Sequence, residues 1–249
     1  MKPVTLITGA SQGIGAACAR LLARQGHSLL IHYAAHADLA LAVAAECLRL
    51  GAPQAVIAQG DLAEEADVLR LFEEADRSLP PLTGLVNNAG IIDRTARLED
   101  MSAARLQRMM AVNVVGPMLC AKEAIRRLSW RHGGHGGVIV NVSSSAVRSG
   151  APAMYVDYAA SKGAMDVLTQ GLAKEVAADG IRVCAVRPGI TDTGIHATGG
   201  EPDRATRLAP TLPMGRAAQP DEVAQAIVWL LSDAASYTAG AILDVTGGR

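Results

Sequence analysis

Several kinds of residue are scarce in this sequence, and each scarcity argues against a class of protein. Only 3% of the 249 residues are aromatic, so an array of side chains for stacking nucleic-acid bases is not expected. A formal net charge of -1 provides no basic surface for nucleic acid. No apolar run approaches the ~20 residues that a membrane-spanning helix requires. We therefore expect a protein that binds neither nucleic acid nor membrane.

Cysteine is also rare, and its distribution indicates reduced thiols in a core. Each cysteine lies in an apolar periodic stretch without a neighbour at metal-ligand spacing: Cys18, Cys47, Cys120 and Cys184. A strand pattern begins close to the first residue with no signal-peptide pattern before it, so a cytoplasmic protein is expected. His132 and His135 lie in a glycine-rich stretch, where a solvated turn is favoured over a metal site. We expect no metal.

Hydrophobic residues make up 50% of the chain, enough for a sizeable core, and their pattern predicts an α/β fold. Short apolar runs predict strands at residues 4–8, 28–33, 55–59, 84–87, 138–142, 182–187 and 241–245. Helical patterns lie between them at 13–25, 38–50, 64–78, 103–127, 157–178 and 221–231. Most of the strand runs are continuously apolar, which is typical of parallel strands covered on both faces. Repeated β-α-β alternation predicts a doubly wound, Rossmann-type parallel sheet of seven strands in a three-layer α/β/α arrangement.

No linker divides the chain, so residues 1–249 are predicted to form one domain. Residues 131–137 are interpreted as a turn that leads into the fifth strand. The long stretch 191–220 is irregular and rich in Gly, Pro and Thr. Long loops in compact domains are usually functional or disordered, and we interpret this one as a substrate lid.

The first predicted strand leads into a glycine-rich turn, TGASQGIG at residues 8–15, and a helix follows. In such a turn Gly9 permits a tight bend, Gly13 lets the backbone approach a pyrophosphate, and Gly15 lets the helix pack close to the strand. The N-terminus of the helix then presents free N–H groups and a partial positive charge to the phosphates. The turn predicts a dinucleotide site formed by Gly9, Ser11, Gln12, Gly13, Ile14 and Gly15.

Further motifs follow the glycine turn in a characteristic order. They are Asp61-Leu62, the run Asn87-Asn88-Ala89-Gly90, Asn113, the triple serine Ser143-Ser144-Ser145, the pair Tyr158 and Lys162 in YAASK, and Pro188-Gly189. With TGxxxGxG, they resemble the short-chain dehydrogenase/reductase family over essentially the whole chain. Its sugar dehydrogenases and 3-oxoacyl-[acyl-carrier-protein] reductases have the most similar motifs. The resemblance implies an NAD(P)-dependent oxidoreductase that moves a hydride between the nicotinamide and a carbonyl or secondary alcohol.

Tyr158 and Lys162 are four residues apart on a predicted helix and therefore share one face. A free tyrosine has a pKa of ~10, too high for easy proton exchange at neutral pH. A nearby ammonium favours the phenolate and lowers that pKa, which suits general acid–base catalysis. We expect Tyr158 to transfer the proton and Lys162 to lower its pKa. The resemblance further implies that Lys162 holds the ribose hydroxyls of the nicotinamide nucleoside.

A serine in this family donates a hydrogen bond to the substrate oxygen. Counting along the fifth strand selects Ser144, whereas the usual family distance from the tyrosine selects Ser145. Ser144 is preferred because the strand fixes geometry locally, while the loop before Tyr158 can absorb an extra residue. Both serines remain candidates.

The asparagines have roles that the resemblance implies. The backbone carbonyl of Asn113 would hold a water that links Lys162 to solvent, although a polar residue on a solvated helix face is the alternative. Asn87 would stabilise the central sheet, and Asn88 would satisfy the loop backbone. Ala89 and Gly90 would pass close to the cofactor.

The end of the second strand bears on cofactor choice. NAD-specific members carry an acidic residue there, and this position is Tyr33, with no acid nearby. We therefore favour NADP(H), with NAD(H) as the alternative, although no Arg or Lys stands there to bind the 2′-phosphate. Asp61 and Leu62 match positions that contact the adenine, and Asp61 could also cap the third helix. Contacts to the nicotinamide half are expected from Pro188, Gly189, Ile190, Thr191 and Thr193.

Two rival functions remain at this point. Epimerases and dehydratases on related folds usually carry an added C-terminal substrate domain, which this chain lacks. A non-catalytic NAD(P)-sensing protein would be expected to lose Tyr158 or Lys162, and both are present. The resemblance also implies subunit contacts through the helices at 103–127 and 157–178 and the last strand. We expect a homotetramer, with a dimer as the alternative, acting on a small-molecule substrate.

Overall fold

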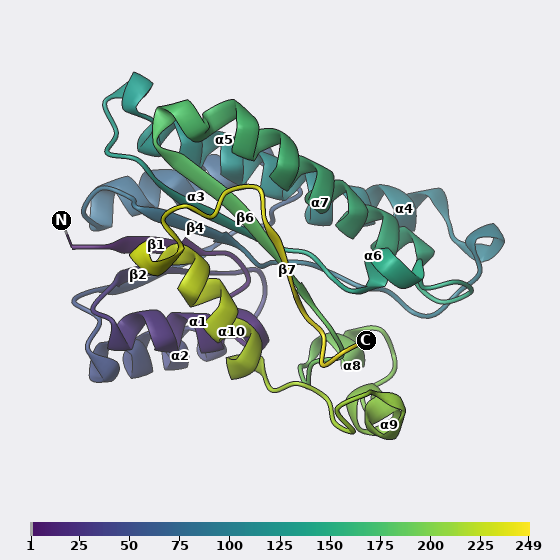
Figure 1. The fold of residues 1–249 in the computed structure, drawn as a ribbon. Helices are drawn as coiled ribbons and strands as arrows, with labels where there is room; N and C mark the ends of the chain where they lie inside the picture. The colour runs from purple at the N-terminus through teal and green to yellow at the C-terminus, as the bar shows by residue number, and fades with distance from the viewer. Residues whose placement is uncertain (1) are drawn as a thin grey trace.

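The computed structural model describes residues 2–249, and it has a seven-stranded sheet at its centre (Figure 1). All strand pairs are parallel, in the order β3-β2-β1-β4-β5-β6-β7. The strands are β1 (Val4–Ile7), β2 (Ser28–Tyr33), β3 (Ala55–Gln59), β4 (Gly84–Asn87), β5 (Gly137–Val142), β6 (Ile181–Pro188) and β7 (Ile242–Val245). The Rossmann-type fold is confirmed, and each predicted strand end lies within one residue of the observed one.

Helices cover both faces of the sheet, as Figure 1 shows. One face carries α1 (Gly13–Arg24), α2 (Ala37–Leu50) and α10 (Pro220–Leu231). The other carries α3 (Glu65–Ser78), α4 (Ala103–Met110), α5 (Gly116–Leu128) and α7 (Val156–Val176). Each layer buries its own apolar cluster against the sheet, which explains why the strands are apolar on both sides.

The strand order reverses between β1 and β4, and this reversal positions the site. Helices that follow β1 and β4 lie on opposite faces, so a crevice opens between their first turns at the carboxyl ends of the strands. Loops after the strands converge there. Fold class and topology thus predict where a ligand binds before any side chain is considered.

The predicted helix at 103–127 is interrupted. A π-helical segment, η2 (Ala111–Val115), separates α4 from α5, and Gly116 donates its N–H to the carbonyl five residues earlier, at Ala111. Pro117 explains the break, because it has no N–H to donate to the carbonyl of Asn113 four residues before it. Such π-turns occur frequently at functional sites.

The stretches predicted to be irregular contain short helices. Residues 191–220 include α8 (Ile195–Thr198), α9 (Arg204–Leu208) and the 3-10 turn η5 (Ala209–Thr211). The loop before α7 contains α6 (Ala146–Ser149), and the turn after α5 begins with η3 (Trp130–His132). These pieces are too short for a periodic pattern to reveal.

The structure also describes the surroundings of the cysteines and of other residues that sequence analysis considered. All four cysteines are free and buried, and burial raises the pKa of the Cys120 thiol to about 12. Within residues 2–249 no three His, Cys, Asp or Glu side chains are grouped so that they could hold a metal ion. No described helix combines the length and apolarity needed to cross a bilayer.

Candidate active site

A cavity of about 630 Å³ lies at the carboxyl ends of the strands, within the size range of small-molecule sites. Its wall includes the glycine turn, the loops after β2 to β6, the start of α7 and the segment with α8 and α9. One continuous space therefore joins the predicted dinucleotide turn to Tyr158 and Lys162.

The glycine turn has the geometry that a dinucleotide requires. Gly9 has a φ of +63°, and a Cβ there would lie 2.9 Å from the Cα of Ala89. Gly13 has a φ of +58° and also lines the cavity. Gln12 precedes α1 without capping it through its side chain, so the first N–H groups of the helix remain available to an anion. These features fit a bound diphosphate.

Gly15 contributes to packing. A Cβ at Gly15 would lie 2.6 Å from both the carbonyl oxygen of Gly9 and the side-chain amide of Asn88. That amide donates to the carbonyls of Thr8, at 2.8 Å, and Gly9, at 2.9 Å. Asn88 thus satisfies the loop backbone as predicted, and its contact with α1 leaves room for glycine alone.

His32, at the end of β2, is a site residue that the sequence analysis missed. Its Nδ1 accepts the N–H of Gly9 at 3.0 Å, and its Nε2 lies 3.0 Å from the carbonyl oxygen of Gly60. Because a backbone N–H can only donate, the neutral ring must carry its proton on Nε2 and donate it to Gly60. Burial lowers the pKa of His32, which favours this neutral form. A lone histidine in an apolar strand gave no pattern from which this role could be inferred.

The adenosine end differs in part from prediction. Tyr33 does not line the cavity: its ring packs against the core beside α1 and α2. This correction follows from strand alternation, since His32 and Ala34 face the cavity and Tyr33 lies between them. Asp61 and Leu62 do line the cavity.

The role of Asp61 as a helix cap is also corrected. Its carboxylate accepts the N–H of Ala63 at 3.0 Å and pairs with Arg108 at 2.8 Å. The N-cap of α3 is Glu64, so Asp61 stabilises the turn before that helix rather than capping it. The bond to Arg108 helps to hold the pKa of Asp61 below its usual value although partial burial opposes this.

Tyr158 and Lys162 lie one turn apart on α7, and both line the cavity. The Lys162 ammonium donates to the carbonyl of Val142 at 2.8 Å and lies 5.8 Å from the centre of the Tyr158 ring. Burial raises the pKa of Tyr158, and a hydrogen bond with Ser144 lowers it. Burial lowers the pKa of Lys162 to about 8. The expected lowering by Lys162 is not found in this geometry: burial outweighs the effect of Ser144 and leaves the pKa of Tyr158 above its ordinary value.

The two candidate serines have different surroundings. Ser144 lies near Tyr158, where it favours a lower pKa of the phenol against the effect of burial, and its Oγ accepts the N–H of Ala146 at 3.1 Å. Ser145 precedes α6, and its backbone N–H donates to the carbonyl of Pro188 at 2.9 Å, which ties the ends of β5 and β6 together. Both line the cavity, but the proximity to Tyr158 favours Ser144 as the serine that meets the reacting oxygen.

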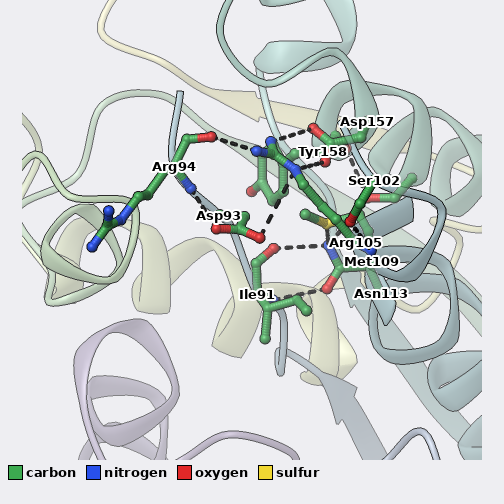
Figure 2. A network of polar contacts seen from close by, with 10 residues as sticks. Ile91, Asp93, Arg94, Ser102, Arg105, Met109, Asn113, Asp157 and Tyr158 are labelled. Atoms are coloured by element: carbon green, nitrogen blue, oxygen red, sulfur yellow. Dashed lines mark hydrogen bonds and ion pairs between the residues drawn. The ribbon is translucent and has the colours of Figure 1, made fainter. Parts of the chain in front are cut away.

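Asn113 is completely buried in the π-helical segment, so a solvated helix face is excluded (Figure 2). Its side-chain oxygen accepts the N–H of Ile91 at 2.8 Å, and its amide donates to the carbonyl of Ile91 at 2.9 Å and to Ser161 at 3.1 Å. A Cβ at Gly90 would lie 3.3 Å from the ammonium of Lys162 and 3.4 Å from Asn113. Asn113 is thus close to Lys162 but does not itself line the cavity.

Figure 2 also shows an ion-pair network that the sequence analysis missed. Arg105 on α4 donates to both carboxylate oxygens of Asp157, at 2.8 and 3.2 Å, and to the carbonyl of Arg94 at 2.6 Å. The Asp157 side chain is only 2% exposed and directly precedes Tyr158. A paired, buried carboxylate of this kind fixes the start of α7 and hence the backbone that carries Tyr158.

The remaining predicted residues divide into two groups. Those that line the cavity are Ser11, Gln12, Ile14, Ala89, Gly90, Pro188, Gly189, Ile190, Thr191 and Thr193. Asn87 does not: its amide donates to Asn141 at 3.0 Å and to the carbonyl of Pro117 at 3.2 Å, where it links β4 to β5 and α5. This geometry agrees with a structural role for Asn87 in the central sheet.

Comparison with known proteins agrees with the geometry. A family model described as enoyl-(acyl carrier protein) reductase matches residues 9–249. The chain is 48% identical over 246 residues to the uncharacterized oxidoreductase YgfF of Escherichia coli (strain K12), covering 99% of each. A 3-ketoacyl-(acyl-carrier-protein) reductase from Brucella melitensis, complexed with NADH, has a TM-score of 0.91 at 33% identity, covering 99% of this chain and 98% of that one. A short chain dehydrogenase from Burkholderia cenocepacia J2315, in complex with NADP, has a TM-score of 0.89 at 32% identity, covering 99% and 97%.

The chain therefore belongs to the short-chain dehydrogenase/reductase family. It is an NAD(P)-dependent oxidoreductase of alcohol and carbonyl groups. Nothing in its site favours a non-catalytic sensor, because the tyrosine and lysine are both present beside the dinucleotide turn.

Proposed function

We propose that Tyr158 is the general acid/base of this oxidoreductase. The observation that carries the proposal is the position of Tyr158: it lines the same cavity as Ser144 and the glycine turn, and the Lys162 ammonium lies 5.8 Å from the centre of its ring. In the reducing direction Tyr158 gives its proton to the substrate oxygen as the carbonyl carbon gains a hydride. In the oxidising direction it takes the hydroxyl proton. Ser144 donates a hydrogen bond to the same oxygen and stabilises the charge that develops there.

The nicotinamide cofactor supplies the hydride donor or acceptor when it is bound. Gly9, Ser11, Gln12, Gly13 and Ile14 would hold its diphosphate at the N-terminus of α1. Asp61 and Leu62 would contact the adenine, and Ala89 and Gly90 would pass beside the ribose. The segment from Pro188 to Thr193 would enclose the nicotinamide half. Lys162 would hold the nicotinamide ribose and exchange protons with Tyr158. Asn113, in the π-helical segment, would connect Lys162 to solvent.

NADP(H) is the proposed cofactor, with NAD(H) as the alternative. The residues that line the cavity after β2 are Ala34, Ala35 and His36, so no carboxylate there would repel a 2′-phosphate. Calorimetry with each reduced cofactor tests the preference. NADPH should bind with the lower Kd, and a lower Kd for NADH would reverse the assignment.

We propose a homotetramer, with a dimer as the alternative. Apolar side chains are exposed on the outer helices at Met110, Val115, Met118 and Val167, and near the C-terminus at Trp229, Tyr237 and Leu243. Two separate apolar surfaces suit two kinds of subunit contact. Light scattering at micromolar concentration should report four or two copies, and a monomer would contradict the proposal. The four free thiols also suit the proposed cytoplasmic location.

Residues 191–220 are proposed as the substrate lid. Residues from α8 and α9 line the cavity opposite Tyr158, and Gly199 approaches the Tyr155 hydroxyl closely enough that its Cβ would lie 3.4 Å from it. Such a lid suits a small or medium-sized carbonyl or alcohol.

A carbonyl panel tests the proposed function. Purified protein is mixed with NADPH or NADH and each of a set of ketones and aldehydes, and loss of the 340 nm absorbance is followed. Turnover of at least one compound, lost in Tyr158→Phe, is expected. Cofactor binding without turnover of any compound would favour the sensor alternative.

A further inference from the structure

The lid carries one arginine whose placement the dinucleotide chemistry does not explain. Arg204, the first residue of α9, lines the same cavity as Tyr158, and its side chain is only 11% exposed. Its guanidinium lies over the ring of Tyr155, 5.1 Å from the ring centre. Tyr155 is the N-cap residue of α7, and its carbonyl oxygen accepts the N–H of Ala159 at 2.9 Å, so Tyr155 and Tyr158 belong to the first turn of that helix.

The neighbours of Arg204 neutralise its charge only in part. Its Nη1 donates to Oε2 of Glu201 at 2.9 Å. The same carboxylate oxygen also accepts from Arg207, and burial together with the nearby Glu201 raises the pKa of the Tyr155 hydroxyl. One carboxylate is therefore shared between two guanidinium groups. Among the described residues, no hydrogen bond involves Nε or Nη2 of Arg204. A mostly buried cation with two free donor nitrogens favours an anionic partner.

The surroundings make Arg204 distinct from the other basic residues of the cavity. Arg108 pairs with Asp61, Lys162 bonds to Val142, and Arg249 ends the chain. His196 lies near Arg204, but burial lowers its pKa, and its Nε2 is 2.9 Å from the carbonyl oxygen of Thr191. Arg249 also lines the cavity, and Gly247 and Gly248 before it approach Met214 and Pro213 of the lid. Arg204 is distinguished by its burial over the ring of Tyr155.

The wall near Tyr155 and Tyr158 is otherwise largely apolar. The side chains there include Ile92, Pro152, Met154 and Ile195. Such a wall suits a hydrocarbon body, and it also lowers the local dielectric, which strengthens an ion pair with Arg204.

We propose that Arg204 binds an anionic group of the substrate, and that the substrate is an oxo or hydroxy acid with an apolar body between its carboxylate and its reacting carbon. Glu201 and Tyr155 orient the guanidinium, so that Nε and Nη2 form the two-pronged donor that a carboxylate matches. Because the tyrosines are close in the chain, the body between the two groups is short. This inference rests on the proposed function of Tyr158, since it describes the other end of the same substrate.

Matched substrates and matched variants test the proposal. The substrates are 4-oxocyclohexanecarboxylate and its neutral primary amide, which have nearly the same shape. Arg204→Met removes the proposed anion contact. Arg207→Met is the control, because it removes the same charge from the same Glu201, yet Arg207 is 58% exposed and does not line the cavity.

The wild-type enzyme should have the higher kcat/KM for the acid. Arg204→Met should reduce that value by about 10- to 100-fold, the usual effect of losing a charge-assisted hydrogen bond, and change the value for the amide by less than about threefold. Arg207→Met should leave the preference intact. An equal loss of kcat/KM for acid and amide would show that Arg204 only stabilises the closed lid, which would overturn the proposal. An undiminished preference for the acid in Arg204→Met would overturn it too.

A binding measurement separates this inference from the proposed function. Cyclohexanecarboxylate, which has no carbonyl to reduce, is titrated calorimetrically into the NADPH-loaded protein, with cyclohexanecarboxamide as the neutral reference. Tighter binding of the carboxylate that disappears in Arg204→Met supports the anion site even if no ketone turns over, which would count against the proposed function alone. Equal binding of the two compounds would overturn the anion site whatever the turnover.

Discussion

The two halves of the cavity are built in different ways. In the cofactor half, contacts come from backbone groups and from glycines where a Cβ would clash, as at Gly9 and Gly15. In the substrate half, contacts come from side chains of segments far apart in the chain, as in the Arg105–Asp157 pair and the stack of Arg204 on Tyr155. A site made from backbone is fixed by a short local sequence. A site made from distant side chains can change its substrate while the fold and the cofactor stay the same.

The largest expected effect comes from a substitution in the substrate half, which should lower turnover without changing cofactor binding. Tyr158→Phe removes the proton donor and acceptor but leaves the glycine turn unchanged. We expect turnover to fall by about 10²- to 10⁴-fold, the usual contribution of general acid–base catalysis. Calorimetric cofactor affinity should stay within about threefold of wild type. Near-normal turnover would remove Tyr158 from the mechanism, and lost cofactor binding would show that the halves are not separable.

The pH dependence of turnover should also arise from groups in the substrate half. Burial raises the pKa of Tyr158 above its ordinary value of ~10 and lowers the pKa of the neighbouring Lys162 to about 8. Oxidation needs the Tyr158 phenolate, so its kcat/KM should rise by about tenfold per pH unit between about pH 7 and 9. Reduction needs the protonated phenol, which predominates over this range, so its kcat/KM should change little. These profiles report the coupled pair rather than one residue.

Cofactor binding measured between pH 7 and 9 is the control for those profiles. It should weaken as Lys162, the proposed ribose contact, loses its proton near pH 8, which is the opposite direction to the oxidation profile. His32 adds no change, because burial keeps its ring neutral over this range. A titration of the binding constant that matches the kinetic profile would assign the pH effect to the cofactor half instead.

A smaller effect is expected from the cofactor half. Gly9→Ala places a Cβ 2.9 Å from the Cα of Ala89 at a backbone φ of +63°. The turn must shift, and overpacking of this kind costs about 1–3 kcal/mol. We expect cofactor Kd to rise by about tenfold, with the same relative loss for every substrate. A change in substrate preference would contradict the separation of the two halves.

The smallest effect concerns strain in the substrate half. Ala151 and Ala153 line or flank the cavity with φ values of 44° and 56°, where residues with a Cβ are disfavoured. Ala153→Gly should relieve this strain and raise the free energy of unfolding by up to about 1 kcal/mol, measured by chemical denaturation. Unchanged or lower stability would show that the loop is not strained. Kinetics of the same variant would tell whether the strain orders the loop for substrate.

The sequence predicts the cofactor half well because its signals are local. Strand ends and the glycine turn follow from spacing within a few residues, and each predicted strand end is correct within one residue. The YxxxK pair is the one part of the substrate half with an equally local signal. The misses have physical causes. Tyr33 faces the core because strand side chains alternate, and the helix at 103–127 breaks because Pro117 lacks an N–H.

The substrate half was predicted poorly because its contacts are not local. Arg105 and Asp157 stand 52 residues apart, and neither lies in a recognisable motif. Arg204 lies in a stretch without periodicity, so its place over Tyr155 depends on how the lid folds back. Ser144 and Ser145 both line the cavity, so spacing along the chain does not choose between them, and the preference for Ser144 stays a prediction that its proximity to Tyr158 supports.

Protonation of His32 sets a lower limit on the pH at which the glycine turn keeps its folded conformation. Its Nδ1 can accept the N–H of Gly9 only while that nitrogen carries no proton. In the unfolded chain the imidazole takes up a proton below its ordinary pKa of ~6.5, whereas burial in the folded protein resists this. Folding stability contributed by the neutral ring is therefore complete above that pH and declines as the solution becomes more acidic. Acid inactivation of this enzyme should begin at the glycine turn, which we propose holds the cofactor diphosphate, before the sheet itself unfolds.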